Sequence, residues 1–462
     1  MRLSRLGRMH FVGIGGIGMS GIAEVLLTMG YTVSGSDLQP SPVTDRLKSL
    51  GAQVFFGHAP EHVGEAQVVV YSSAVHRDNP EVAEASRLGV PAIPRAEMLA
   101  ELMRMKSCIT VAGTHGKTTV TAMLAHLADG SNMDATVVIG GRLSTIGTSA
   151  RLGKSDLMVA EADESDRSFL LLFPTIAVIT NIEWDHVDCY PTLQDLRDAF
   201  LQFANNVPFY GSCVVNGDDA NLRAILPRMN RRTVSFGMKE GNDYQAVREN
   251  SEGSRERFEV LHSGAPLGEI RLPHPGRHNV MNALCVVAVA REMGIPIETV
   301  AESLATFPGA DRRFELKGEA AGIRVIDDYG HHPTEVEATL EAGRRSSRGG
   351  RLAVAFQPHR YSRLEAFQED FARSLLSADL LFVTEVYPAG EAPIPGVSGE
   401  MLYERIRQLG HGAVHYCADV EDLAGAAAPR LREGDLFIIL GAGNITRAAG
   451  PVLDLLGREK EP

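Results

Sequence analysis

The chain has 462 residues, 44% of them hydrophobic and 22% charged, which is ordinary for a globular protein and long enough for about three domains. A net charge of −13 argues against non-specific nucleic-acid binding, and the five widely spaced cysteines argue against a disulfide framework. No apolar run approaches the ~20 residues that cross a bilayer, and glycines from Gly13 onward interrupt the stretch behind the basic start, so we expect a cytoplasmic protein.

The first elements predicted are a strand at residues 9–12, a glycine turn, and a helix with apolar residues at helical spacing after Ile22. Two more strands are expected at residues 31–36 and 67–71. A strand, a turn and a helix in this order are typical of parallel α/β architecture.

The turn contains Gly13, Gly15 and Gly18 in the pattern G-x-G-x-x-G, and Asp37 follows about 20 residues later. Such glycines let the backbone approach a pyrophosphate at a helix N-terminus, and an acidic residue at this distance can bind a ribose hydroxyl. By itself the pattern is compatible with a dinucleotide, another nucleotide, or merely a tight turn.

A second series starts with a strand at residues 107–112, followed by a polar loop at 113–119 and a helix. Strands are predicted at 157–160 and 176–180. Residues 243–272 alternate polar and apolar, which favours antiparallel strands with a hairpin, and a helix begins near His278.

The loop ends in the Gly-Lys-Thr of a phosphate-binding loop. Lys117 is expected to reach the β- and γ-phosphates of a nucleotide and Thr118 to ligate Mg²⁺. The first glycine of the standard motif would fall on Val111, so only the end of the motif is present, and a chance lysine at a helix start is the alternative.

Acidic and imidazole side chains follow the next two strands. Glu161 ends an apolar strand, where a hard oxygen ligand for Mg²⁺ is expected, whereas Asp166 is interpreted as part of a solvated turn. His186 follows the strand at 176–180 and is either a metal contact or a structural histidine.

A third series has predicted strands at residues 323–329, 352–356, 380–383 and 436–440. Asp328 and His331 lie at the end of the first of these strands, and Arg360 and Arg363 follow the second. Arginines bind a carboxylate in a bidentate manner and a carboxylate attracts an ammonium group, so this edge suits a free amino acid. A surface ion-pair network is the alternative.

Taken together, these segments resemble the Mur ligase family over essentially the whole chain. Singly they are weak or moderate signals, but their order and spacing are highly specific. The segments that carry the resemblance are residues 10–24, 113–119, 161–166, 181–186, 278–282, 327–333 and 359–363.

The resemblance implies an α/β fold of three domains. Residues 1–105 would form a Rossmann-like domain that binds a UDP-sugar, so the first glycine loop would hold the UDP pyrophosphate rather than NAD. Residues 106–312 would form a P-loop ATPase-type domain with extra antiparallel strands. Residues 313–462 would form a Rossmann-like domain that binds the amino acid.

The resemblance also implies an ADP-forming ligase of peptidoglycan synthesis, which uses ATP and Mg²⁺ to join L-alanine to UDP-N-acetylmuramate through an acyl phosphate. We expect a monomer or weak homodimer. The alternatives are a related ligase that attaches a recycled peptide to the same UDP-sugar, an NAD(P)-dependent oxidoreductase, and a nucleotide-regulated binding protein without chemistry.

The site residues implied are grouped by ligand. The UDP-sugar would contact Gly13, Gly15, Gly16, Gly18, Met19, Ser20, Asp37, Ser72 and Ser73. ATP would contact Gly113, Thr114, His115, Gly116, Lys117, Thr118, Thr119, Asn279, Asn282, Arg313 and Asp328. The amino acid would contact Asp328, Tyr329, His331, Arg360 and Arg363. The catalytic residues would be Lys117, Glu161, His186 and His331, and the metal ligands Thr118, Glu161 and His186.

The sequence departs from several family members at one position. These members use a lysine, modified to a carbamate, to hold a second magnesium ion. The corresponding residues 196–208 of this chain contain no lysine, which leaves the second metal site unassigned.

Overall fold

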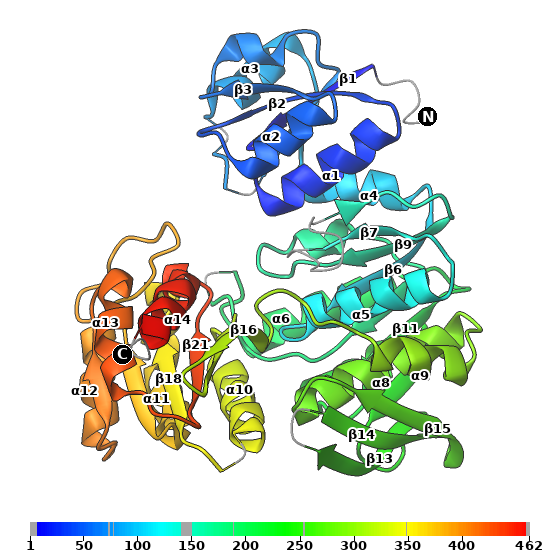
Figure 1. The fold of residues 1–462 in the computed structure, drawn as a ribbon. Coiled ribbons are helices and arrows are strands. Elements are labelled where there is room, and N and C mark those ends of the chain that lie inside the picture. The colour runs from blue at the N-terminus through cyan, green and yellow to red at the C-terminus, as the bar shows by residue number, and fades with distance from the viewer. Residues whose placement is uncertain are drawn as a thin grey trace.

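The computed structural model describes residues 7–72, 74–76, 78–139, 150–187, 189–252, 255–347 and 349–458. These residues form three successive α/β units, each built on its own sheet (Figure 1), which confirms the predicted fold class. Within the described residues, no helix is both long and apolar enough to cross a membrane.

The first sheet consists of five parallel strands, in the order β3 (Gln53–Phe56), β2 (Thr32–Asp37), β1 (Arg8–Val12), β4 (Val68–Tyr71) and β5 (Ala92–Pro94). Its helices are α1 (Ile17–Thr28), α2 (Pro42–Ser49), α3 (Pro80–Leu88) and α4 (Arg95–Met103). Gly35 of β2 allows a close approach to the strand beside it, because a Cβ there would lie 2.6 Å from the carbonyl oxygen of Phe11.

The central sheet has the order β15 (Ala265–Leu272), β14 (Arg255–His262), β13 (Tyr244–Glu252), β12 (Arg232–Gly237), β11 (Ser212–Asn216), β10 (Ile176–Ile179), β6 (Ser107–Ala112), β9 (Leu157–Glu161), β7 (Thr136–Val138) and β8 (Ala150–Arg151). Its helices are α5 (Lys117–Gly130), α6 (Leu193–Asn205), α7 (Ala220–Ile225), α8 (Arg277–Glu292) and α9 (Ile297–Ala305). The pairings β13–β14 and β14–β15 are antiparallel, as predicted for this segment.

The third sheet has the order β16 (Glu315–Ala320), β17 (Ile323–Asp328), β21 (Leu436–Leu440), β18 (Leu352–Phe356), β19 (Leu380–Val383) and β20 (Val414–Tyr416). Its helices are α10 (Pro333–Ser346), α11 (Tyr361–Ser374), α12 (Gly399–Gln408), α13 (Leu423–Ala427) and α14 (Ala449–Arg458). Edge strand β16 is antiparallel to β17, and the other strands are parallel. The carboxyl ends of these parallel strands therefore share one edge.

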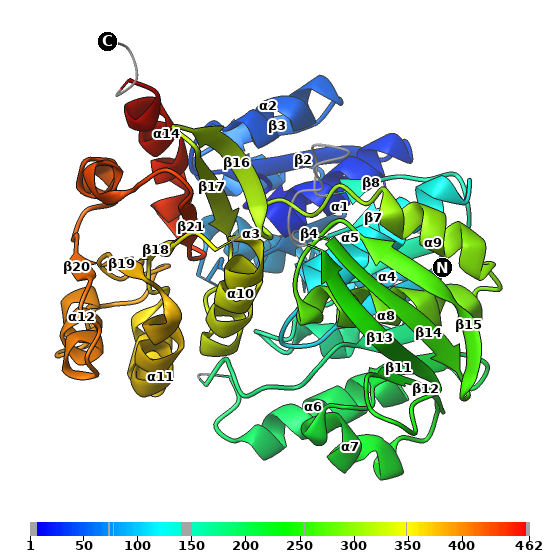
Figure 2. The ribbon, with the colours of Figure 1, turned by 60° about the horizontal axis from the view of Figure 1, so that its bottom comes forward.

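The three units are joined differently. One apolar cluster runs through the first and central units and includes Met9, Leu102, Phe169 and Phe200. The two apolar clusters of the third unit contain no described residue before Phe314. In Figures 1 and 2 the third unit lies beside the central unit, and α10 packs against α8.

Candidate active site

The loop between β6 and α5 is pressed against the segment that follows β10. Gly113 has φ +133° and Gly116 has φ +83°, conformations that a side chain rarely adopts. A Cβ on Gly113 would lie only 2.0 Å from Thr180 Oγ1, and one on Gly116 would lie 2.7 Å from Asn282 Oδ1. The two glycines therefore allow the backbone to turn tightly in front of the α5 N-terminus, which is a favourable position for phosphate.

Lys117, the first residue of α5, folds back over this loop. Its Nζ donates to the carbonyl oxygens of Gly113 at 2.6 Å and Thr114 at 3.1 Å, and to Glu164 Oε1 at 2.8 Å. Burial lowers the pKa of Lys117, but the neighbouring Glu164 carboxylate raises it more, so the pKa lies above its usual value. The lysine is therefore a fixed positive charge at the centre of the loop.

The three residues predicted to ligate metal lie around the same point. Thr118 Oγ1 donates to the two oxygens of Glu161 at 3.0 and 3.2 Å. His186 Nε2 is 3.4 Å from Glu164 Oε1. Glu164 Oε2 is buried and has no hydrogen-bond partner among the described residues. A buried carboxylate oxygen without a partner, beside a second carboxylate, a hydroxyl and an imidazole, fits a divalent cation.

A cavity of about 490 Å³ lies on one side of the loop, between α8 and the start of α10. Six residues predicted to bind ATP line it: His115, Gly116, Thr119, Asn279, Asn282 and Arg313. A seventh, Asp328, also lines it, together with the apolar side chains of Phe236 and Met281. The size and the mixed polar and apolar wall suit a nucleoside.

A second cavity of about 650 Å³ lies on the phosphate side of the loop and is lined by residues of all three units. Gly18 and Arg95 come from the first unit, while Tyr329 and His331 come from the third. The predicted phosphate and metal residues Lys117, Thr118, Glu161 and His186 line the same cavity. The two cavities share His115, Gly116, Arg313 and Glu335. One elongated ligand can therefore occupy both.

The residues predicted to bind the UDP-sugar surround the loop between β1 and α1. Asp37 Oδ2 accepts a hydrogen bond from the backbone N–H of Gly15 at 2.8 Å, so this carboxylate holds the glycine loop itself. Gly13 has φ +79° and lies beside Ser72. A Cβ added to Gly13 would be 3.6 Å from Ser72 Oγ. Ser73 lies outside the described residues.

The other members of that set differ in exposure. Met19 packs in the apolar cluster and is 1% exposed, and Ser20 is buried beside it on α1. Gly16 directly precedes α1 and is exposed. Gly18 is the member of the set that lines the 650 Å³ cavity, where Arg95 lies against it.

The residues predicted to bind the amino acid do not all meet at one point. Tyr329 and His331 line the larger cavity. Asp328 faces the nucleoside cavity and accepts from the backbone N–H of Phe314 at 2.7 Å. Arg363 pairs with Asp185 of the central unit.

Arg360 lies further out. Its Nη1 is 3.7 Å from Glu391 Oε1, and the side chain is 36% exposed. Its backbone has φ +71°, which is unusual for a residue with a side chain and aims Arg360 differently from its helical neighbours.

His331 is a neutral imidazole in this setting. Burial lowers its pKa to about 3. Its Nδ1 lies 3.0 Å from the carbonyl oxygen of Tyr329, which can only accept, so Nδ1 carries the proton. His331 therefore presents Nε2 as a hydrogen-bond acceptor.

Three carboxylates of the site, Glu183, Asp185 and Glu335, were not predicted from the sequence. His115 lies between Glu183, whose Oε2 is 2.8 Å from Nε2, and Glu335, whose Oε1 is 3.1 Å from Nδ1. Burial alone would lower the pKa of His115, but the two carboxylates raise it to about 9. Glu183 and Asp185 lie within the strand-end segment 181–186, so the available signal was their position directly after β10.

Comparison with known proteins places these features in a family. Residues 8–107 match the family model "Mur ligase family, catalytic domain", residues 111–290 match "Mur ligase middle domain", and residues 312–443 match "Mur ligase, glutamate ligase domain". The UDP-N-acetylmuramate–L-alanine ligase of Geobacter sp. strain M21 is 53% identical over 457 residues, which cover 99% of each chain. The enzyme of the same name from Myxococcus xanthus is 52% identical over 97% of this chain and 95% of its own.

Two solved structures of similar proteins share the fold of this chain over nearly its whole length. The UDP-N-acetylmuramate-alanine ligase of Thermotoga maritima superposes with a TM-score of 0.83 at 30% identity, covering 98% of this chain and 100% of that one. A murein peptide ligase of Psychrobacter arcticus gives 0.70 at 25% identity, covering 98% and 99%. This membership is incompatible with the oxidoreductase alternative for the first glycine loop. With three family models matched in succession and more than half of its residues identical to full-length relatives, the chain belongs to the Mur ligase family.

Proposed function

We propose that the chain is an ATP-dependent ligase that joins L-alanine to the carboxylate of UDP-N-acetylmuramate and releases ADP and phosphate. The observation that carries the proposal is the pair of cavities that meet at the phosphate loop, one suited to a nucleoside and the other lined from all three units. Relatives over the full length bear the name of this activity. ATP and nucleotide-linked sugars are cytoplasmic compounds, so the reaction belongs in the cytoplasm.

Each of the three units binds one of the three substrates. Residues 1–105 bind the UDP-sugar, residues 106–312 bind ATP, and residues 313–462 bind the amino acid. The adenosine occupies the cavity beside Asn279 and Asn282, and the triphosphate crosses the loop into the larger cavity. Lys117 then exchanges its contact with Glu164 for one with the β- and γ-phosphates, because a triphosphate offers more negative charge than one carboxylate.

Magnesium is the cation we propose for the group formed by Thr118, Glu161, Glu164 and His186. When bound, it supplies positive charge that offsets the charge on the transferring phosphoryl group. Glu164 is added to the ligands expected from sequence, because its Oε2 is buried without a partner among the described side chains.

The reaction proceeds in two steps. A carboxylate oxygen of UDP-N-acetylmuramate attacks the γ-phosphorus, the bond to the β-phosphate oxygen breaks, and ADP leaves. The neutral amine of L-alanine then attacks the acyl carbon of the acyl phosphate. Inorganic phosphate leaves with the electrons of the broken C–O bond and takes up the proton that the nitrogen loses. Lys117 neutralises charge in the first step, and the Nε2 atom of His331 accepts a hydrogen bond from the amine and orients it.

A coupled assay of ADP release tests the proposal. We expect ADP release with UDP-N-acetylmuramate and L-alanine together, and little when either is left out. A murein peptide ligase is among the similar structures, so the tripeptide L-alanyl-γ-D-glutamyl-meso-diaminopimelate is the comparison substrate. A kcat/KM higher for the tripeptide than for L-alanine would contradict the proposal.

A further inference from the structure

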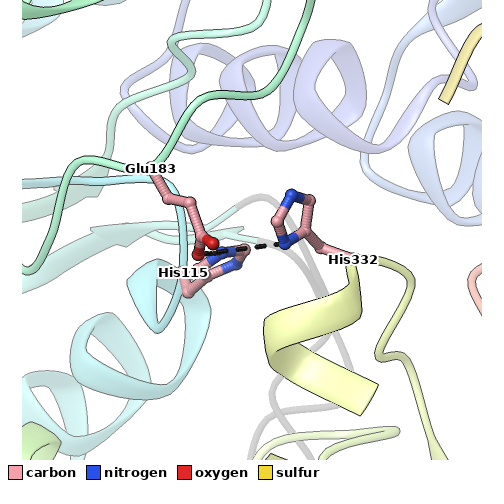
Figure 3. A group of neighbouring side chains, drawn as sticks. All are labelled: His115, Glu183 and His332. Atoms are coloured by element: carbon pink, nitrogen blue, oxygen red, sulfur yellow. Dashed lines mark hydrogen bonds and ion pairs between the residues drawn. The ribbon is translucent and has the colours of Figure 1, made fainter. Parts of the chain in front are cut away.

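Three side chains from separate segments converge beside the phosphate loop: His115 of the loop, Glu183 after β10, and His332 immediately before α10 (Figure 3). One ligand atom of each lies within 4.8 Å of the other two. Figure 3 shows Glu183 against the ring of His115, with one nitrogen of His332 turned toward the same carboxylate. The group joins the central unit to the third unit.

His332 is the unusual member. Its side chain is 3% exposed and is directed toward the backbone N–H of Glu335 in a capping box at the start of α10, yet neither ring nitrogen makes a well-formed hydrogen bond within the described parts of the chain. Nδ1 lies 3.8 Å from Glu183 Oε2, too far for a hydrogen bond, and the ring meets Phe367 edge-on at 4.9 Å between centroids. A buried imidazole that makes no well-formed hydrogen bond is unfavourable unless something binds it.

His115 and Glu183 are each held by a hydrogen bond on the side that faces away from the group. Glu335 Oε1 is 3.1 Å from Nδ1 of His115, which leaves Nε2 of His115 facing the group. The hydroxyl of Thr334 donates to Glu183 Oε1 at 2.5 Å, which leaves Oε2 facing the group. A carboxylate on the far nitrogen of a ligating histidine is the usual outer shell of a metal site.

We propose that His115, Glu183 and His332 form a binding site for a divalent transition-metal cation of the zinc class. Donors around tetrahedral zinc, at bonds of about 2.0–2.1 Å, lie roughly 3.3 Å apart. The observed separations of 2.8 Å for His115–Glu183 and 3.8 Å for Glu183–His332 lie on either side of that value. Two imidazoles and one carboxylate favour zinc over magnesium, which prefers oxygen ligands.

The occupied site would tie the start of α10 to the phosphate loop. It is separate from the magnesium group, since it shares none of Thr118, Glu161, Glu164 or His186. Because it bridges two units whose apolar clusters are separate, one ion there would hold the third unit against the central one.

Cobalt titration of the nucleotide-free full-length chain, in excess Mg²⁺, tests the site. We expect one Co²⁺ per chain with the visible bands of four- or five-coordinate cobalt, displaced by Zn²⁺. His332→Asn keeps a residue suited to a helix N-cap and should weaken binding by more than ~100-fold. Glu183→Gln should do the same. His411→Asn, at the opposite edge of the third sheet, should bind as the parent chain does.

Three outcomes would overturn the site: no visible cobalt spectrum in the parent chain, an intense near-ultraviolet band from cysteine ligation, or unchanged affinity in both His332→Asn and Glu183→Gln. Circular dichroism checks each variant for folding, and if one is unfolded the other decides. The measurement uses no substrate, so its result is independent of the ligase assay.

Discussion

Arg363 of α11 and Asp185 of the segment after β10 form a buried, two-point ion pair between the third and central units. Nε lies 3.2 Å from Oδ1, and Nη2 lies 3.0 Å from Oδ2. The two side chains are 6% and 7% exposed. Burial raises the pKa of Asp185, but the charge of Arg363 lowers it by more, so the pKa lies well below its usual range. The arginine expected to bind an amino-acid carboxylate thus already binds a protein carboxylate.

Arg360→Ala and Arg363→Ala should raise the KM for L-alanine by about 10- to 100-fold, the effect of losing a charged hydrogen bond to a carboxylate, and the KM for ATP much less. Steady-state kinetics with each substrate varied measures both constants. Asp185→Asn is the comparison for Arg363. If Arg363→Ala and Asp185→Asn each raise the KM for L-alanine and the KM for ATP equally, the pair only joins the units. Arg363 would then not be part of the amino-acid site.

Lys117→Ala should lower kcat for ADP release by at least ~10²–10³-fold, because the transferring phosphoryl group loses its fixed positive charge. Binding of UDP-N-acetylmuramate, measured by calorimetry, should stay within a few-fold of the parent value. Lys154→Ala, which removes an exposed lysine, is the control. Turnover at the parent rate in Lys117→Ala would refute the phosphate loop.

Gly113→Ala should abolish ATP binding, because its Cβ would overlap Thr180 Oγ1 at 2.0 Å in a backbone conformation with φ +133°. Gly130→Ala is a matched control at the other end of α5, where the nearest atom to an added Cβ is 3.7 Å away. This control should be neutral or stabilise the chain by up to about 1 kcal/mol. Nucleotide binding by fluorescence and thermal unfolding distinguish the two, and normal ATP affinity in Gly113→Ala would contradict the loop geometry.

When no transition-metal ion is bound, the pH dependence of stability should include a contribution from His115. Its pKa is about 9 in the folded chain, against 6.5 for an unperturbed histidine. The folded state binds this proton more tightly, so the contribution is complete below pH 6.5 and is lost as the pH rises through about 9. Its size is on the order of 1–3 kcal/mol.

Thermal unfolding between pH 6 and pH 9.5 measures that contribution when the parent chain is compared with Glu335→Gln. The variant should lose less stability than the parent over this interval, because one carboxylate beside His115 is gone. Glu404→Gln, on an exposed helix face, should follow the parent curve. Identical curves for all three chains would show that His115 does not gain the proton on folding.

Sequence reasoning located the central strands accurately because β6, β17, β18 and β21 are short apolar runs bounded by glycine or polar residues. The phosphate loop, the strand-end carboxylate Glu161 and the antiparallel hairpins followed from equally local signals. Edge strands such as β8 and β16 were not predicted, because they are short or carry little apolar periodicity.

Pairings between distant segments could not be predicted. Glu335 lies 220 residues from His115, and Arg363 lies 178 residues from Asp185, so each pair depends on how two units are placed. Glu164 is within the acidic segment noted from sequence, but choosing it over Glu161 as the partner of Lys117 requires knowing which side chain turns inward.

The separation of the apolar clusters determines which part of the chain can move. The first unit cannot leave the central one without exposing apolar side chains of their shared cluster, such as Leu102 of α4 and Phe169, to water, which is unfavourable. The third unit is held by polar contacts such as Arg363–Asp185, and opening lets water solvate both charges of that buried pair, which offsets the loss of the contact. Arg312 and Phe314 are hydrogen-bonded to Asp327 and Asp328 of the third unit. Opening and closing around substrates should therefore be a swing of residues 312–458 about the connecting segment at 306–311, with the other two units travelling as one body.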